Sequence, residues 1–90
     1  MTRYDPRAFE DTIQGQRQNL SGEMLFDLGL ACSTGKNGTT DLVSAHKWFN
    51  IAALKGKREA ARYRQEIARE LSDAQVAEAQ RAAREWLRTH

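Results

Sequence analysis

The side chains that could support catalysis are few and lie far apart along the chain. The two histidines, His46 and His90, are separated by most of the second half of the sequence, and the single cysteine, Cys32, has no histidine beside it. A catalytic or metal site needs such groups to converge, as a nucleophile with its base or as a set of ligands. This distribution argues against both kinds of site.

Two glutamates have a spacing that could place a pair of carboxylates on one helix face. Glu66 and Glu70 are four residues apart, but Arg62 and Arg69 stand near them. Mixed charges at helical spacing are typical of a solvated ion-pair network. We therefore expect no catalytic residue, no metal and no cofactor, and we expect that the protein is not an enzyme.

A glycine-containing stretch, STGKNGTT over residues 33–40, could suggest a phosphate-binding loop. The full P-loop spacing is absent, and no hydrophobic strand precedes the stretch. Gly35 and Gly38 can adopt positive φ, which suits a tight turn. The stretch is predicted to join two antiparallel helices.

Composition limits the class of protein. The chain has 90 residues, of which 40% are hydrophobic and 29% charged, and a net charge of +2. Residues 55–90 hold nine basic and six acidic side chains, and residues 1–54 hold five and six. One cysteine cannot form an internal disulfide, and no apolar run resembles a signal peptide or reaches the ~18 residues of a membrane span. We expect one small cytoplasmic domain without membrane insertion.

Capping signals divide the chain into helices. Asp5 before Pro6, Ser21, either Thr40 or Asp41, and the Ser72–Gln75 pair are typical of helix starts. No segment shows the alternation of a strand. The sequence predicts an all-α fold of about five helices, over residues 6–18, 22–33, 41–55, 57–71 and 73–88.

The pattern of large and small residues predicts how these helices pack. Gly29 lies within an apolar stripe, which suggests that another backbone passes close to it. We expect Ala45 and Ala52 to lie against helix 22–33 near Gly29, and Trp48 and Phe49 to fill wider space on either side. The predicted core consists of Leu25, Leu28, Gly29, Cys32, Leu42, Ala45, Trp48, Phe49, Ala52, Ala53, Gly56, Ala60, Tyr63, Ile67 and Trp86.

The last two helices show amphipathic stripes of the same kind. Their predicted apolar positions are Ala60, Tyr63, Ile67 and Leu71, followed by Val76, Ala79, Ala83, Trp86 and Leu87. Exposed i, i+3 pairs are expected between Glu78 and Arg81 and between Glu85 and Arg88, each worth a few tenths of a kcal/mol.

One segment resembles the Sel-one-like repeat, a relative of the tetratricopeptide repeat. The positions that carry the resemblance over about residues 24–60 are Leu28-Gly29, Gly35, Asp41, Ala45, Trp48-Phe49, Ala52-Ala53, Gly56 and Ala60. Cys32 stands where the family usually has an aromatic residue. The resemblance implies a fragment of a right-handed α-α superhelix, with an N-terminal helix over 1–20, the repeat over 21–60 and a capping helix pair over 61–90.

The resemblance also implies a function as a non-catalytic interaction module, an adaptor or scaffold that binds another protein. The candidate partner-binding residues are Glu23, Phe26, Asp27, Leu30, His46 and Lys47. Phe26 and Leu30 could instead pack against an N-terminal helix that carries Phe9 and Ile13.

Two alternatives remain open. A basic cluster over residues 55–64 could bind nucleic acid, which the balanced overall charge makes the weaker hypothesis. A short stack with an unfilled end could also bind a second copy of itself.

Overall fold

A computed structural model describes residues 20–36 and 38–90, and this part of the chain is all-helical, without strands. Its helices are α2 (Gly22–Thr34), α3 (Leu42–Leu54), α4 (Glu59–Ala68) and α5 (Asp73–Thr89). The helix predicted over residues 6–18 lies outside the described residues. The expected all-α class is confirmed for the described part.

The largest boundary difference concerns α4, which begins two residues later and ends three residues earlier than predicted. Beyond its C-terminus the backbone continues in i, i+3 hydrogen bonds, from Glu70 N to Ile67 O and from Leu71 N to Ala68 O. Leu71 still packs against the core from this turn. Leu71 is therefore packed as the apolar stripe predicted, although the α-helix ends before it.

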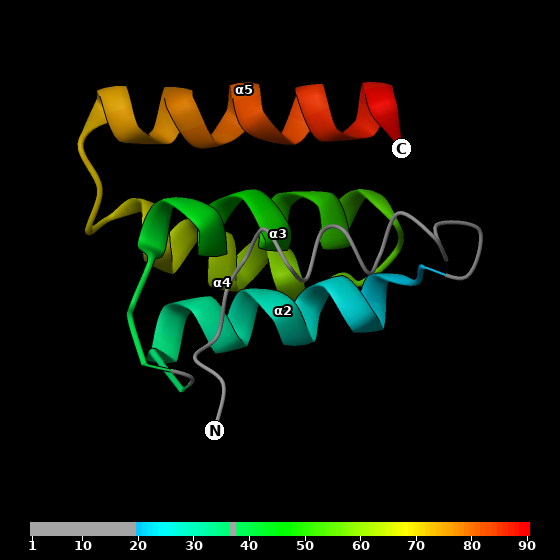
Figure 1. Ribbon diagram of the computed structural model, residues 1–90, viewed down its shortest axis with the longest axis horizontal. Coiled ribbons are helices and arrows are strands. Elements are labelled where there is room, and N and C mark those ends of the chain that lie inside the picture. The colour runs from blue at the N-terminus through cyan, green and yellow to red at the C-terminus, as the bar shows by residue number, and fades with distance from the viewer. Residues whose placement is uncertain (1–19, 37) are drawn as a thin grey trace.

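The helices are arranged around α3, against which α2, α4 and α5 all pack. Figure 1 shows α3 between α2 and α5, with successive helices running in opposite directions. In α3 the buried residues are Ala45, His46, Trp48, Phe49, Ile51 and Ala52. Burial on several sides explains why this helix is apolar around most of its circumference.

The helix starts follow the signals in the sequence. The Ser21 hydroxyl accepts a hydrogen bond from the Met24 N–H, and the Asp41 carboxylate accepts one from the Ser44 N–H. Ser72 and Gln75 form a complete capping box at the start of α5. Each cap satisfies backbone donors that a helix start would otherwise leave unpaired.

Gly29 is a close-packing position, as predicted, but a side chain and not a backbone lies over it. A Cβ at Gly29 would come within 2.7 Å of the Phe49 ring. The expectation that Phe49 fills space away from this contact is wrong, because the bare backbone of α2 accepts the flat ring. The close backbone approach is at Gly22, where an added Cβ would lie 3.1 Å from Ala52 O.

The Phe49 ring connects three helices. Its centroid lies 5.6 Å from that of Phe26 on α2 and 5.4 Å from that of Tyr63 on α4, and these two rings meet edge to face at 5.1 Å. A separate pair, Trp48 and Trp86, joins α3 to α5 in an edge-to-face contact at 5.6 Å. Such pairs contribute about 0.5–1.5 kcal/mol beyond the area they bury.

Most of the predicted core is buried or half-buried, with two corrections. Gly56 is exposed, and its positive φ of 102° gives it a role in the turn after α3. Leu87, expected on the apolar stripe of α5, is 36% exposed because it lies beside the packed face and not on it. Ile51 is fully buried and was not among the predicted core residues.

Gly29→Ala tests the contact between ring and backbone. In an unobstructed helix this change stabilises by about 1 kcal/mol. Here the new methyl group displaces the Phe49 ring, so we expect a net loss of about 1–3 kcal/mol in the free energy of unfolding. Urea denaturation followed by circular dichroism measures it.

The matched background is Phe49→Leu. In that background Gly29→Ala should cost much less or stabilise the fold, because the smaller side chain leaves room for the methyl group. An equal loss in both backgrounds would refute the proposed contact.

Candidate functional site

Two of the six predicted binding residues are buried, which corrects their assignment to a partner surface. Phe26 is 7% exposed and lies among Phe49, Tyr63 and the Lys57 ammonium. His46 is 2% exposed. Tyr63 on α4 packs against Phe26, and the charge of Arg64 on the same helix acts on His46.

The other four residues remain partly accessible. Leu30 is half-buried and packs against the core. Glu23 and Asp27 are exposed on α2, and Lys47 is half-buried on α3. Glu23 is engaged, because its carboxylate pairs with Lys57 at 2.6 Å. Asp27 and Lys47 are thus the predicted residues best placed to contact a partner.

Phe26→Ala distinguishes a core role from a surface role. We expect it to lower the free energy of unfolding by about 3 kcal/mol, the range of a buried Phe truncation. Chemical denaturation checks this, with Thr34→Ala on the exposed side of the same helix as a control. A change in the free energy of unfolding below about 0.5 kcal/mol would show that Phe26 is not a core residue.

His46 on α3 is buried near α4, where the charge of Arg64 acts on its imidazole ring. Its Nδ1 has no hydrogen-bond partner within the described residues. Arg64 on α4 donates to the Asn50 side-chain oxygen at 2.6 Å. Burial of the imidazole, and then the positive charge of Arg64, lower the pKa of His46 below 6.5. The neutral ring is therefore the form compatible with the packed α3–α4 contact.

This lowered pKa sets the direction of a pH effect on stability. Below pH 6.5 the unfolded chain binds a proton at His46 more readily than the folded chain does. The contribution of the neutral His46 ring to the free energy of unfolding is therefore complete above pH 6.5 and is lost as the pH falls through the pKa of the folded state. We expect His46→Gln to reduce the fall in urea midpoint between pH 7.5 and pH 5. Identical pH profiles for the two proteins would contradict this assignment.

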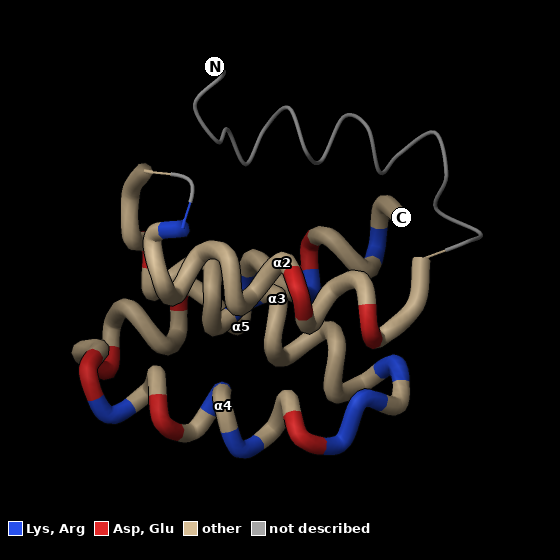
Figure 2. Tube along the Cα trace, turned by 90° about the horizontal axis from the view of Figure 1, so that it is seen from below, with Lys and Arg blue, Asp and Glu red and all other residues tan. Residues whose placement is uncertain are grey.

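The basic cluster predicted over residues 55–64 is largely engaged in the fold. The Lys57 ammonium bonds to Glu23 at 2.6 Å and Glu59 at 2.9 Å, and these hydrogen bonds raise its pKa. Arg64 bonds to Asn50, and Arg62 lies over the Tyr63 ring. Figure 2 shows basic and acidic residues alternating along α4. The segment is a mixed-charge surface and not a continuous basic patch.

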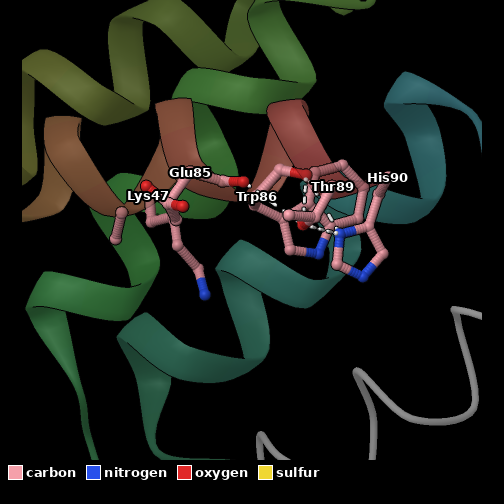
Figure 3. Close-up of a pocket in the computed structure, with 6 residues that line it drawn as sticks. Lys47, Glu85, Trp86, Thr89 and His90 are labelled. Carbon is pink, nitrogen blue, oxygen red and sulfur yellow. Dashed lines mark hydrogen bonds between the residues drawn. The ribbon is translucent and has the colours of Figure 1, made fainter.

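The described surface has a shallow depression between α3 and the last turns of α5. It encloses about 290 Å³ and is lined by Lys47, Ala82, Glu85, Trp86, Thr89 and His90. Figure 3 shows the Trp86 and His90 rings lying face to face in it. Their centroids are 4.6 Å apart and their planes differ by 6°. A flat aromatic platform is thus held at the end of α5.

Hydrogen bonds fix the orientation of this platform. His90 Nδ1 lies 3.0 Å from Trp86 O and 2.8 Å from Thr89 Oγ1. On the other side of the depression, the Lys47 ammonium lies 4.0 Å from the centre of the Trp48 ring. Glu85 is paired with Arg88 at 2.7 Å, as its spacing predicted. The Glu85 carboxylate is therefore already partly neutralised.

Several nitrogens at this contact have no hydrogen-bond partner within the described residues. They are Trp86 Nε1, His90 Nε2 and, beneath them, Trp48 Nε1. Trp86 is 5% exposed, so its indole N–H is largely withdrawn from water. A buried unpaired donor costs about 1–3 kcal/mol.

Sequence reasoning missed this depression, apart from Lys47. A signal was present, because residues 82 and 86 lie four positions apart, on one face of the predicted last helix. What the spacing could not show is that this face meets Lys47, which is 39 positions from Trp86. Trp86 was predicted as core, and it is indeed buried, but it also forms a wall of the depression.

The described residues offer little else in the way of chemistry. Among them, no group of three His, Cys, Asp or Glu side chains could hold a metal ion. Cys32, on α2, is buried in the hydrophobic core. No helix in the part of the chain described here is both long and apolar enough to cross a bilayer.

Comparison with known proteins identifies no relative of this chain. No protein-family model matches the chain, and neither the curated proteins nor the solved structures contain a match.

Proposed function

We propose that the protein is a non-catalytic protein-interaction module in which the α3–α5 depression receives a segment of a partner protein. The observation that carries the proposal is the stacked Trp86–His90 pair that lines the depression, where the buried Trp86 Nε1 and His90 Nε2 have no hydrogen-bond partner among the described residues. Tryptophan is among the residues most often found at the energetic centres of protein interfaces.

The chemistry of the walls indicates what the partner presents. Trp86 Nε1 is a donor only, and Lys47 supplies a cation, so both favour an oxygen acceptor such as a backbone carbonyl or a carboxylate. Ala82 leaves space for a chain to lie against α5. A peptide segment that combines an apolar side chain with an exposed carbonyl or carboxylate fits these walls.

The repeat-like arrangement of residues 24–60 supports the same function. The α2–α3 hairpin places Gly29 and Phe49 at the helix contact and Trp48 toward the following helix pair. Proteins with Sel-one-like repeats, which these positions resemble, act as adaptors. The engaged state of Lys57, Arg62 and Arg64 favours a protein partner over nucleic acid.

Site-specific photocrosslinking in the native cells tests the proposal. A photoreactive residue at Ala82, which lines the depression, should give a discrete crosslinked species with another protein, identified by mass spectrometry. The same residue at Gln65, exposed on α4, serves as the matched control and should give none. Equal labelling from both positions, or a crosslink to nucleic acid removed by nuclease, would overturn the proposal.

Lys47→Glu provides a second measurement on the same site. The reversed charge should weaken the Ala82 crosslink at least fivefold, because a carboxylate repels the expected acceptor group. The melting temperature serves as the control for folding. An undiminished crosslink in a folded variant would exclude Lys47 from the interface.

A further inference from the structure

A row of arginines lies along the outer side of α5. We call it the α5 arginine ridge, formed by Arg81, Arg84 and Arg88, all of which are exposed. Spacings of three and four residues place them on one face of the helix, opposite the face whose residues are buried against α3. Figure 1 shows α5 along one edge of the molecule, so this side faces away from α2, α3 and α4.

Two of the three guanidinium groups have no counter-charge within the described residues. Arg88 bonds to Glu85 at 2.7 Å, whereas Arg81 and Arg84 form no ion pair there. The pair that helical spacing predicted between Glu78 and Arg81 is therefore not formed. From residue 79 to residue 90 the chain holds three arginines and one glutamate, so this half of α5 carries a net positive charge.

The ridge differs in this respect from the basic residues over 55–64. There the cations of Lys57, Arg62 and Arg64 are held by contacts within the fold. Arginines without a counter-charge attract carboxylates, and the planar guanidinium group can bind a carboxylate through two parallel hydrogen bonds. The ridge is therefore complementary to an acidic surface.

The flanks of the ridge favour a protein over nucleic acid. Leu87 is 36% exposed and follows Arg84 by three positions, so an apolar contact is available beside the charges. Glu78 and Glu85 lie on the other flank, where they would repel a phosphate backbone. The aromatic ring of α5, Trp86, is buried, and the ridge thus lacks the exposed stacking platform on which proteins bind single strands.

The spacing of the arginines indicates the conformation of the partner. Along the axis of α5, the Cα atoms of Arg81 and Arg84 are about 4.5 Å apart, and those of Arg84 and Arg88 are about 6 Å apart. Carboxylates three and four residues apart on a second helix beside α5 repeat these separations. In an extended segment, residues on the same side recur every ~6.6 Å, which fits the shorter separation poorly.

We propose that the α5 arginine ridge binds an acidic amphipathic helix of a partner protein. Carboxylates of that helix pair with Arg81 and Arg84, and its apolar side chains contact Leu87. This inference goes beyond the proposed function, because neither arginine lines the α3–α5 depression.

A binding assay with a defined probe tests this inference on the full chain. The probe is a fluorescein-labelled 14-residue helical peptide of Leu, Ala and Glu, with its glutamates along one face. A second peptide of the same composition has them distributed around the helix. Fluorescence anisotropy should show saturable binding of the first peptide and at least fivefold weaker binding of the second. Equal affinity, or no saturable binding of the first peptide, would overturn the inference.

Matched variants locate the site. Arg84→Glu should weaken binding of the first peptide at least tenfold, and Leu87→Ser at least threefold. Arg58→Glu makes the same change in net charge at the exposed start of α4 and should alter the affinity less than twofold. If Arg84→Glu and Arg58→Glu have the same effect, the peptide responds only to net charge and the ridge is not its site.

Two further outcomes separate this inference from others. A 14-nucleotide single-stranded RNA that binds more tightly than the peptide, and is released by Arg84→Glu, would assign the ridge to phosphate groups and refute an acidic helix. The Ala82 crosslink should persist in Arg84→Glu, because it reports the α3–α5 depression. Peptide binding without that crosslink would support the ridge and count against the proposed function, and the crosslink without peptide binding would do the opposite.

Discussion

The arrangement of this protein depends on the contact between the Phe49 ring and the backbone of Gly29. With no Cβ in the way, the ring lies directly on α2, and an added Cβ would be 2.7 Å from it. From that position the ring also reaches Phe26 and Tyr63. One side chain of α3 thereby sets the distance to α2 and anchors α4, which requires a glycine on one helix and a flat ring on the other.

The crowding around α3 explains the polar groups buried there. Three helices pack on α3, and His46 is buried there with its Nδ1 lacking a hydrogen-bond partner among the described residues. The two tryptophans join α3 to α5, and their indole nitrogens also lack partners within the described residues. Unpaired buried donors are costly, so their concentration beside an open depression is a reason to regard that depression as a binding surface.

The sequence by itself determined the features that depend on near neighbours in the chain. The caps at Ser21 and Ser72, the helical class and the apolar stripes follow from hydrogen bonds and side-chain periods that act within a few residues. It also indicated that Gly29 is a close contact and that Lys47 and Asp27 are accessible.

Only the tertiary structure decided which surfaces meet. The burial of Phe26 and His46, the ring over Gly29, the pairing of Lys57 with Glu23 and the approach of Trp86 to Lys47 all join residues on different helices. Helical spacing gives the direction of a side chain around its own axis but contains no information on which other helix lies in that direction. That choice is made by the packing of the whole chain, and the candidate site follows from it.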